Sequence, residues 1–242
     1  MKFTLLEDLG PKAVWLVEDA SPALLNALRR AVIAELDAFA IDSVEFFENS
    51  SPMFNEYVAN RVGLVPLAFD DSLDPNAQVI FTLDAEAVDA PRVVYSSELK
   101  SQDDAIHAYA EHVPLIKLGK GQVLRLQGTA IKGKAKTHAK FQSAVASYGN
   151  LCEFKTVEKC RKCGVEIRMR GLSKHAASKI KKAPDACELC IKCAEARKDA
   201  AKEEARDWIF FVESFNNVPA VRQLERAVQV LEDDLKVFEN EG

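Results

Sequence analysis

The pattern of apolar and polar positions first predicts a short strand followed by a helix. Ala13 to Val17 is apolar throughout and reads as a strand. Ser21 and Pro22 then supply a helix N-cap and a proline suited to the first helical position. The apolar residues that recur at helical spacing are Leu24, Leu25, Leu28, Ala31, Val32 and Leu36, whereas Asn26, Arg29 and Arg30 leave that face. This stripe requires a partner surface.

The middle of the chain changes to short apolar runs separated by turn residues. From Ser43 to about Gly133 this pattern indicates a mixed, strand-rich region. Its clearest runs are Val79–Leu83, Arg92–Tyr95 and Val123–Leu126. Residues 55–62 predict a helix, and the polarity of residues 103–111 predicts a surface or loop segment.

The C-terminal part predicts a strand, a turn and a final helix. Trp208 to Phe211 has strand character, Asn216 and Asn217 form a turn, and a helix starts near Pro219. Its apolar residues are Val221, Leu224, Val228, Leu231, Leu235 and Phe238, spaced alternately by three and four as in a heptad seam. Such a narrow seam fits burial within the chain, but together with the first stripe it favours a helix-packed subunit interface.

Composition is that of an ordinary globular protein. The chain has 242 residues, 48% hydrophobic and 29% charged, with room for one large core or two smaller ones. An acidic residue at Glu7 interrupts the N-terminus before any secretory signal forms, and no segment reaches transmembrane length. We therefore expect a cytoplasmic protein without a membrane partner.

The six cysteines are confined to one stretch, at positions 152, 160, 163, 187, 190 and 193. Bunched C-x-x-C pairs in a reducing compartment indicate metal ligation rather than a disulfide framework. The stretch is also basic, because residues 155–182 hold ten Lys or Arg against two Glu, whereas the whole chain has a net charge of −5. An acidic surface is therefore a candidate partner for it.

The cysteine spacing leaves two metal centres open. Cys187, Cys190 and Cys193 form C-x-x-C-x-x-C, which offers three thiolates to one iron–sulfur cubane, with Cys160 or Cys163 as the fourth ligand. Alternatively, the pairs 160/163 and 187/190 form a four-thiolate zinc knuckle, which leaves Cys193 unexplained. Cys152, between Leu151 and Phe154 in a less polar stretch, is more typical of a small core residue.

Catalytic motifs are not found in the sequence. The four histidines are scattered without the carboxylate or second histidine of a hydrolytic site, and Gly119-Lys120-Gly121 resembles a turn more than a phosphate loop. We therefore expect a chain without catalytic residues.

Several separated motifs carry a family resemblance. These are SPALLNALRRAV at residues 21–32, IDSVEFFENSS at 41–51, NRVGLVPLAF at 60–69 and the long stretch VPLIKLGKGQ…KFQ at 113–142. In this order they resemble the family of D subunits of archaeal DNA-directed RNA polymerase, which shares its signature with the bacterial alpha N-terminal domain. The seam helix at the C-terminus is similar to that family's dimerisation helix.

The resemblance implies an α+β fold in three parts. An alpha-N-terminal-domain-like dimerisation domain would comprise residues 1–45 and 207–242, with a strand-rich domain inserted at 46–158 and a small ferredoxin-like, cysteine-rich insertion at 159–206. The implied function is a non-catalytic assembly platform that heterodimerises with subunit L and binds the small subunits N and P and the large catalytic subunits. DNA would be contacted only indirectly, through the complex.

The resemblance also implies roles for individual residues. Leu24, Leu28, Leu224, Val228, Leu231 and Leu235 would form or support the seam, and Asn26, Arg29, Arg30 and Arg61 would contact other subunits. The insertion would hold one iron–sulfur cluster, [3Fe-4S] or [4Fe-4S], with zinc as the fallback. Because Ala194-Glu195-Ala196-Arg197 follows Cys193, the family's further cysteine and proline are missing, and two full clusters are not expected.

Two other functions compete with the scaffold. A ferredoxin-like electron carrier would be reduced reversibly by one electron at an exposed cluster. A zinc-stabilised nucleic-acid-binding module would bind DNA or RNA through the basic stretch with a steep salt dependence. The long cysteine-free portion disfavours the first, and the lack of aromatic residues among the lysines disfavours the second.

Overall fold

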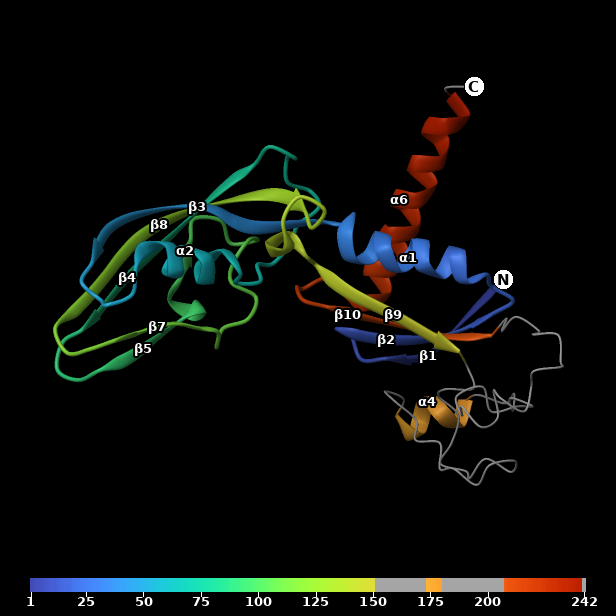
Figure 1. The fold of residues 1–242 in the computed structure, drawn as a ribbon, viewed down its shortest axis with the longest axis horizontal. Helices are drawn as coiled ribbons and strands as arrows, with labels where there is room; N and C mark the ends of the chain where they lie inside the picture. The colour runs from blue at the N-terminus through green and yellow to red at the C-terminus, as the bar shows by residue number, and fades with distance from the viewer. Residues whose placement is uncertain (151–172, 180–206, 241–242) are drawn as a thin grey trace, which may run out of the picture. The chain divides into compact units, whose positions relative to one another are not determined.

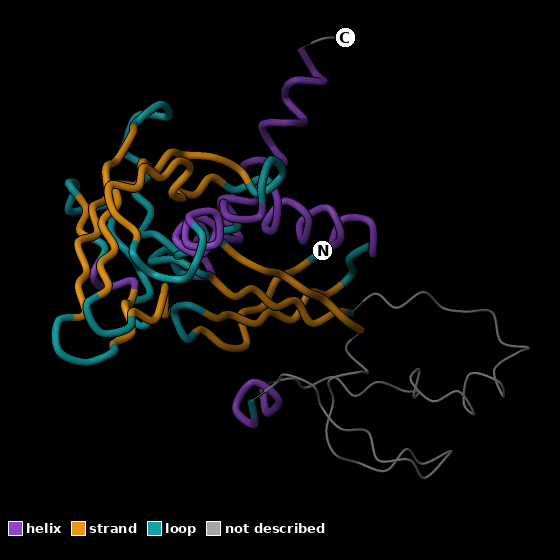
Figure 2. Tube along the Cα trace, turned by 60° about the vertical axis from the view of Figure 1, so that its left-hand side comes forward, coloured by secondary structure: helices purple, strands orange, loops and turns teal. Residues whose placement is uncertain are grey.

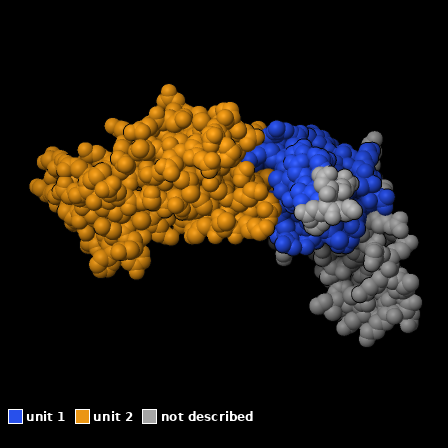
Figure 3. Space-filling view, turned by 90° about the horizontal axis from the view of Figure 1, so that it is seen from above, with its two compact units in different colours: residues 1–31, 145–213, 220–242 blue, residues 32–144, 214–219 orange. Residues whose placement is uncertain are grey.

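The computed structural model describes residues 1–150, 173–179 and 207–240. The chain forms two compact units, coloured separately in Figure 3. The first comprises Met1–Ala31, Val145–Glu213 and Ala220–Gly242, and the second Val32–Ala144 and Ser214–Pro219. The second unit begins at Val32 because the long strand that starts at Asp37 pairs along its length with a strand of that unit. The three-part division implied by the resemblance stays a prediction.

The first unit is built on a four-stranded sheet of order β1-β2-β10-β9 (Figure 1). Its strands are β1 (Lys2–Asp8), β2 (Lys12–Glu18), β10 (Trp208–Ser214) and β9 (Ala144–Asn150). β2 pairs antiparallel with both β1 and β10, which places Trp15 opposite both Leu5 and Phe210. The predicted strands at 13–17 and 208–211 are confirmed, and the two ends of the chain share one sheet.

Both faces of this sheet are covered. All residues from Ala13 to Val17 are buried, as expected for a central strand with helices on either side. On one face Val14 and Leu16 pack with Ala176 of the short helix α4 (Lys174–Lys179). Figure 1 shows helices α1 and α6 on the opposite face. The α4 docking is reinforced by Lys179, whose Nζ donates to the Leu6 carbonyl at 2.6 Å.

Helix α1 (Pro22–Ala34) begins where the sequence predicts. The Ser21 hydroxyl accepts a hydrogen bond from the Leu24 N–H at 3.3 Å, which caps one of the free donors of the first turn. The apolar stripe is buried at Leu25, Leu28, Ala31 and Val32. Just before the helix, the Trp208 indole N–H donates to the Ala20 carbonyl at 3.0 Å and ties this turn to the sheet.

The second unit holds a sheet of order β3-β8-β4-β6 and a two-stranded sheet of β5 and β7. Its elements are β3 (Asp37–Asn49), α2 (Asn55–Gly63), β4 (Gln78–Ala87), β5 (Arg92–Tyr95), η1 (Ser96–Glu98), β6 (Lys100–Ser101), β7 (Pro114–Leu118), β8 (Gln122–Lys134) and η2 (Ala139–Phe141). The predicted strands and the helix at 55–62 are confirmed. Residues 103–111 are a loop, but not wholly a surface one, because Ile106 is completely buried.

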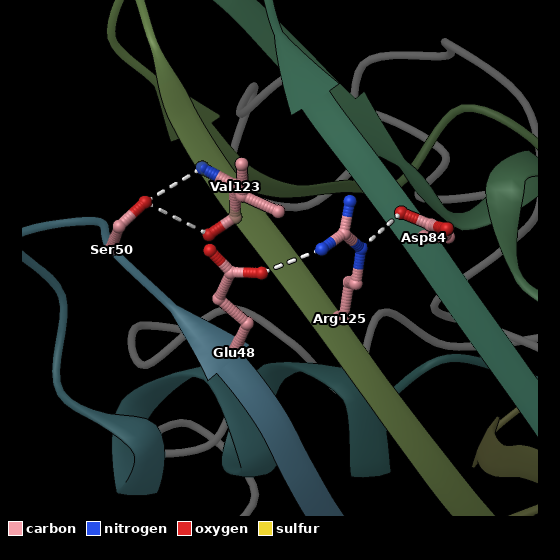
Figure 4. Close-up of polar contacts among 5 residues, drawn as sticks. All are labelled: Glu48, Ser50, Asp84, Val123 and Arg125. Carbon is pink, nitrogen blue, oxygen red and sulfur yellow. Dashed lines mark hydrogen bonds and ion pairs between the residues drawn. The ribbon is translucent and has the colours of Figure 1, made fainter.

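A cross-strand ion-pair network lies on the exposed face of the larger sheet (Figure 4). Arg125 of β8 is directly opposite Glu48 of β3 and Asp84 of β4. Its guanidinium bridges both carboxylates, at 2.6 Å from Glu48 and 3.0 Å from Asp84. The hydrogen bond to Asp84 is the main reason that the pKa of Arg125 is raised. At the end of β3, Ser50 Oγ accepts from the Val123 N–H at 2.7 Å.

Candidate subunit interface

Helix α6 (Ala220–Asn240) changes character along its length. In the first half Ala220, Gln223, Leu224 and Ala227 are buried, and α6 packs on β2. In the part from Val228 onward, called the second half below, Val228 is 39% exposed and Leu235 is 63% exposed. Figures 1 and 2 show this half extending beyond the strands of the first sheet. The second half therefore presents apolar side chains that its own unit does not cover.

The exposed residues continue the same helical stripe that the first half buries. Leu224, Val228, Leu231 and Leu235 follow one another at steps of four, three and four, which keeps them on one side of a helix. The seam predicted from the sequence is thus divided by the end of the sheet beneath it. The exposed apolar segment, Val228 to Leu235, is called the seam segment below.

Polar residues of the second half fall into two sets. Asp233 lies on the side opposite the seam and bonds within the helix, at 2.9 Å to Lys236 Nζ and 2.8 Å to Gln229 Nε2. The Lys236 hydrogen bond is the main cause that lowers the pKa of Asp233, and the same contact raises the pKa of Lys236. Glu232 and Asp234 flank the seam on its two sides and are exposed.

Similarity to a known protein family extends over most of the chain. Residues 15–235 match the family described as RNA polymerase Rpb3/Rpb11 dimerisation domain. The chain belongs to this family. The matched range runs from β2 to the exposed end of the α6 seam and includes residues of both units.

Relatives in this family carry the name DNA-directed RNA polymerase subunit Rpo3. That of Archaeoglobus fulgidus is 31% identical over 94% of this chain and 92% of its own length. That of Pyrobaculum neutrophilum is 34% identical over 92% of this chain and 87% of its own length. The Natronomonas pharaonis relative is 42% identical, but the alignment spans only 55% of this chain and 53% of the relative.

The interface residues implied for α1 are placed differently from one another. Leu24 is 38% exposed in the first turn, whereas Leu28 is only 4% exposed and belongs to the chain's own core. Asn26 Oδ1 accepts two hydrogen bonds from the Arg29 guanidinium, at 3.0 and 3.2 Å, and Arg30 is exposed. Leu24 and Arg30 are therefore available to a partner, while Leu28 supports the helix from beneath.

Arg61, the other cation in the family motif, has a structural partner. It lies in α2, and its guanidinium donates to the backbone carbonyls of Leu115 at 2.7 Å and Pro114 at 2.5 Å. These bonds tie α2 to β7. The side chain is nevertheless exposed, so a role in subunit contact stays a prediction.

The predicted metal ligands lie outside the described residues; they are Cys160, Cys163, Cys187, Cys190 and Cys193. Cys152, predicted to be a core residue, lies outside them as well. Within the described ranges no group of three or more His, Cys, Asp or Glu could hold a metal ion. The metal centre therefore stays a prediction from cysteine spacing. Within the insertion expected at residues 159–206, the structure describes Ser173 and α4. The sequence pattern did not suggest that α4 packs on the first sheet.

A cavity of about 620 Å³ opens beside α4 on the same face of the first sheet. The apolar lining includes Val14, Val145 and Phe211. The polar lining includes Lys12 and Glu213, which form an ion pair at 3.1 Å. Among the described helices, none combines the length and apolarity needed to cross a membrane.

Proposed function

We propose that this chain is a non-catalytic assembly subunit of a DNA-dependent RNA polymerase and pairs with a small L-type subunit through the seam segment of α6. The observation that carries this proposal is the exposure of Val228 and Leu235 on a stripe whose other half is buried. A helix face of this kind is stabilised in water when a second helix covers it. The family description as a dimerisation domain supports the same use of the surface.

The remaining subunits would dock on the platform that this pair forms. Exposed Arg30 and Arg61 are candidates for contacts with the large catalytic subunits, as are Asn26 and Arg29 of α1. The small subunits N and P would join the same complex. Contact with DNA would come only through the assembled enzyme, in the cytoplasm.

Matched substitutions test the pairing. Leu235→Asp places a charge in the seam segment, whereas Val88→Asp places the same charge at a 62% exposed valine of the second unit. The full chain is co-expressed with the L-type subunit of its source organism, and complex formation is measured by sedimentation and titration. We expect Leu235→Asp to weaken the pair at least tenfold, about 1.4 kcal/mol, and Val88→Asp to leave it unchanged.

Two results would contradict the assembly role. The first is a wild-type chain that is a stable monomer without affinity for the L-type subunit. The second is that the wild-type chain and Leu235→Asp bind the L-type subunit with equal affinity. This result would show that the seam segment is not part of the interface. The circular dichroism spectrum of Leu235→Asp should match that of the wild type, because Leu235 lies outside the chain's own core.

We further propose that the insertion holds one iron–sulfur cluster, of three or four irons. Cys187, Cys190 and Cys193 would supply three thiolates and Cys160 or Cys163 the fourth; thiolate donors in this spacing suit such a cluster. The cluster would stabilise a segment with few large apolar residues rather than carry electrons. Iron, zinc and acid-labile sulfide are measured on the complex purified without oxygen. Iron with matching sulfide supports the cluster, and stoichiometric zinc without sulfide replaces it by a zinc knuckle.

A further inference from the structure

We infer that the acidic edges of the seam segment select its partner: they favour a helix whose own apolar seam is bordered by Lys or Arg, and they oppose pairing of α6 with a second copy of this chain. This inference rests on the proposed pairing through α6. It adds the chemistry of the partner and identifies Glu232 and Asp234 as specificity-determining residues.

The two carboxylates occupy the positions that decide helix pairing. Counted from the seam, Glu232 and Asp234 fall on the e and g positions of the heptad that places Val228 and Leu235 at a. At 3.6 residues per turn, each lies roughly 60–100° from the neighbouring seam leucines, one on either side. Residues at these positions face the corresponding edges of a partner helix and set its choice by charge.

Both carboxylates are also available to an external cation. They are exposed, and neither forms an ion pair within the described part of the chain. Lys236, the cation of the second half of α6, forms an ion pair with Asp233 at 2.9 Å. Its interaction with Glu232 is a longer-range electrostatic attraction without an ion-pair contact. Glu225, an acidic residue of the first half at an equivalent edge position, is already paired with Arg222 at 2.9 Å.

Helices α1 and α6 of a second copy of this chain do not supply an apolar seam bordered by cations. Pairing of two α6 helices in either direction would bring carboxylate edges against each other, which is destabilising. Helix α1 carries the exposed Arg30, but Arg30 lies six positions after Leu24, which at 3.6 residues per turn puts the two about 120° apart. Its cation therefore does not border the apolar residue that α1 exposes.

The test uses the full chain with the L-type subunit of its source organism. Glu232→Lys/Asp234→Lys reverses both edges, and Asp233→Asn is the matched control because it removes a carboxylate from the far side of the same helix. We expect the wild-type affinity to fall on going from about 50 to about 500 mM NaCl. We also expect the reversed variant to bind at least tenfold more weakly at low salt and to lose this salt dependence. Asp233→Asn should behave like the wild type.

Self-association gives an independent readout. The neutral variant Glu232→Gln/Asp234→Asn should self-associate more strongly than the wild type at low salt, as measured by sedimentation of each chain alone. If the wild type binds the L-type subunit but the reversed variant binds equally well with the same salt dependence, the charge inference fails and the pairing stands. If the wild type does not bind that subunit, the proposed function fails. In that case, a neutral variant that self-associates no more strongly than the wild type overturns the charge inference as well.

Discussion

The side-chain amide of Asn217 pairs with both backbone groups of Phe69. Its Oδ1 accepts from the Phe69 N–H at 2.7 Å, and its Nδ2 donates to the Phe69 carbonyl at 3.0 Å. This exchange reproduces with a side chain the pair of bonds that two residues of an antiparallel ladder share. Phe69 in turn lies 6.1 Å from the Phe39 ring and beneath Lys132 Nζ. Asn217 therefore fastens the short segment Ser214–Pro219 to the second unit.

Asn217→Ala should destabilise the chain because it leaves the Phe69 N–H and carbonyl without these partners. We expect a loss of about 1–3 kcal/mol in the free energy of unfolding, measured by urea denaturation. Asn76→Ala, at an exposed asparagine of the same unit, should change it by less than about 0.5 kcal/mol. Equal effects of the two substitutions would show that the Phe69 pairing contributes no net stability.

Trp208→Phe should destabilise the turn before α1, because it removes the indole N–H that the Ala20 carbonyl accepts in a buried position. The unpaired carbonyl and the lost indole volume should together lower the melting temperature by about 3–10 °C, for a cost of roughly 1–3 kcal/mol. Tyr148→Phe is the neighbouring control, since the Tyr148 hydroxyl is exposed and 3.5 Å from the Pro22 carbonyl. Its melting temperature should stay near that of the wild type.

Gly133→Ala should be poorly tolerated in β8. A Cβ at this position would lie 2.8–2.9 Å from three atoms of the buried Phe141 ring, so the ring or the strand must move. Overpacking of this kind costs about 1–3 kcal/mol. Thermal unfolding of Gly133→Ala, Phe141→Leu and the double variant forms a cycle. The double variant should be more stable than the sum of the single effects indicates; simple additivity would exclude the clash.

The Asp233–Lys236 pair should give a characteristic titration. Because the folded-state pKa of Asp233 is lowered, its stabilising contribution is present above the pKa of an unfolded aspartate and is lost as the pH falls through the folded pKa. The folded-state pKa of Lys236 is raised, so its contribution is present below the unfolded lysine pKa and is lost as the pH rises through the folded one.

Carbon-detected NMR titration checks this pair. We expect the Asp233 midpoint below that of an unfolded aspartate in the wild type and closer to it in Lys236→Met, because the hydrogen bond from Lys236 is the largest cause of the shift. An unchanged Asp233 midpoint in Lys236→Met would assign the shift to Gln229 instead.

Local signals in the sequence predicted several elements correctly. Ser21 and Pro22 located the start of α1, the apolar run from Ala13 marked the central strand β2, and Pro219 marked the start of α6. Each of these elements is specified by residues that are close together in the chain. The α+β class was therefore predictable from the sequence alone.

Features that depend on distant partners were not predictable in this way. β3 extends back to Asp37 because it pairs with β8 as far as Lys134, and no nearby residue signals that register. Periodicity put Leu28 and Leu235 on similar stripes, yet only the position of the sheet beneath each helix decides that Leu28 is buried and Leu235 exposed. Asn217 was recognisable only as a turn residue, since its acceptor and donor lie 148 positions away.

The sheet shared by both ends of the chain sets an order for events on the ribosome. Val32–Ala144 emerges as one stretch and can pair β3, β8 and β4 while synthesis continues. β2 meanwhile has β1 on one side and an open edge on the other until β10 appears, and α6 follows β10. A nascent chain that stops before Trp208 thus lacks both the strand that closes the sheet and the helix through which we propose that the chain pairs with an L-type subunit. Under the proposed pairing, binding of that subunit would report that translation has passed this point.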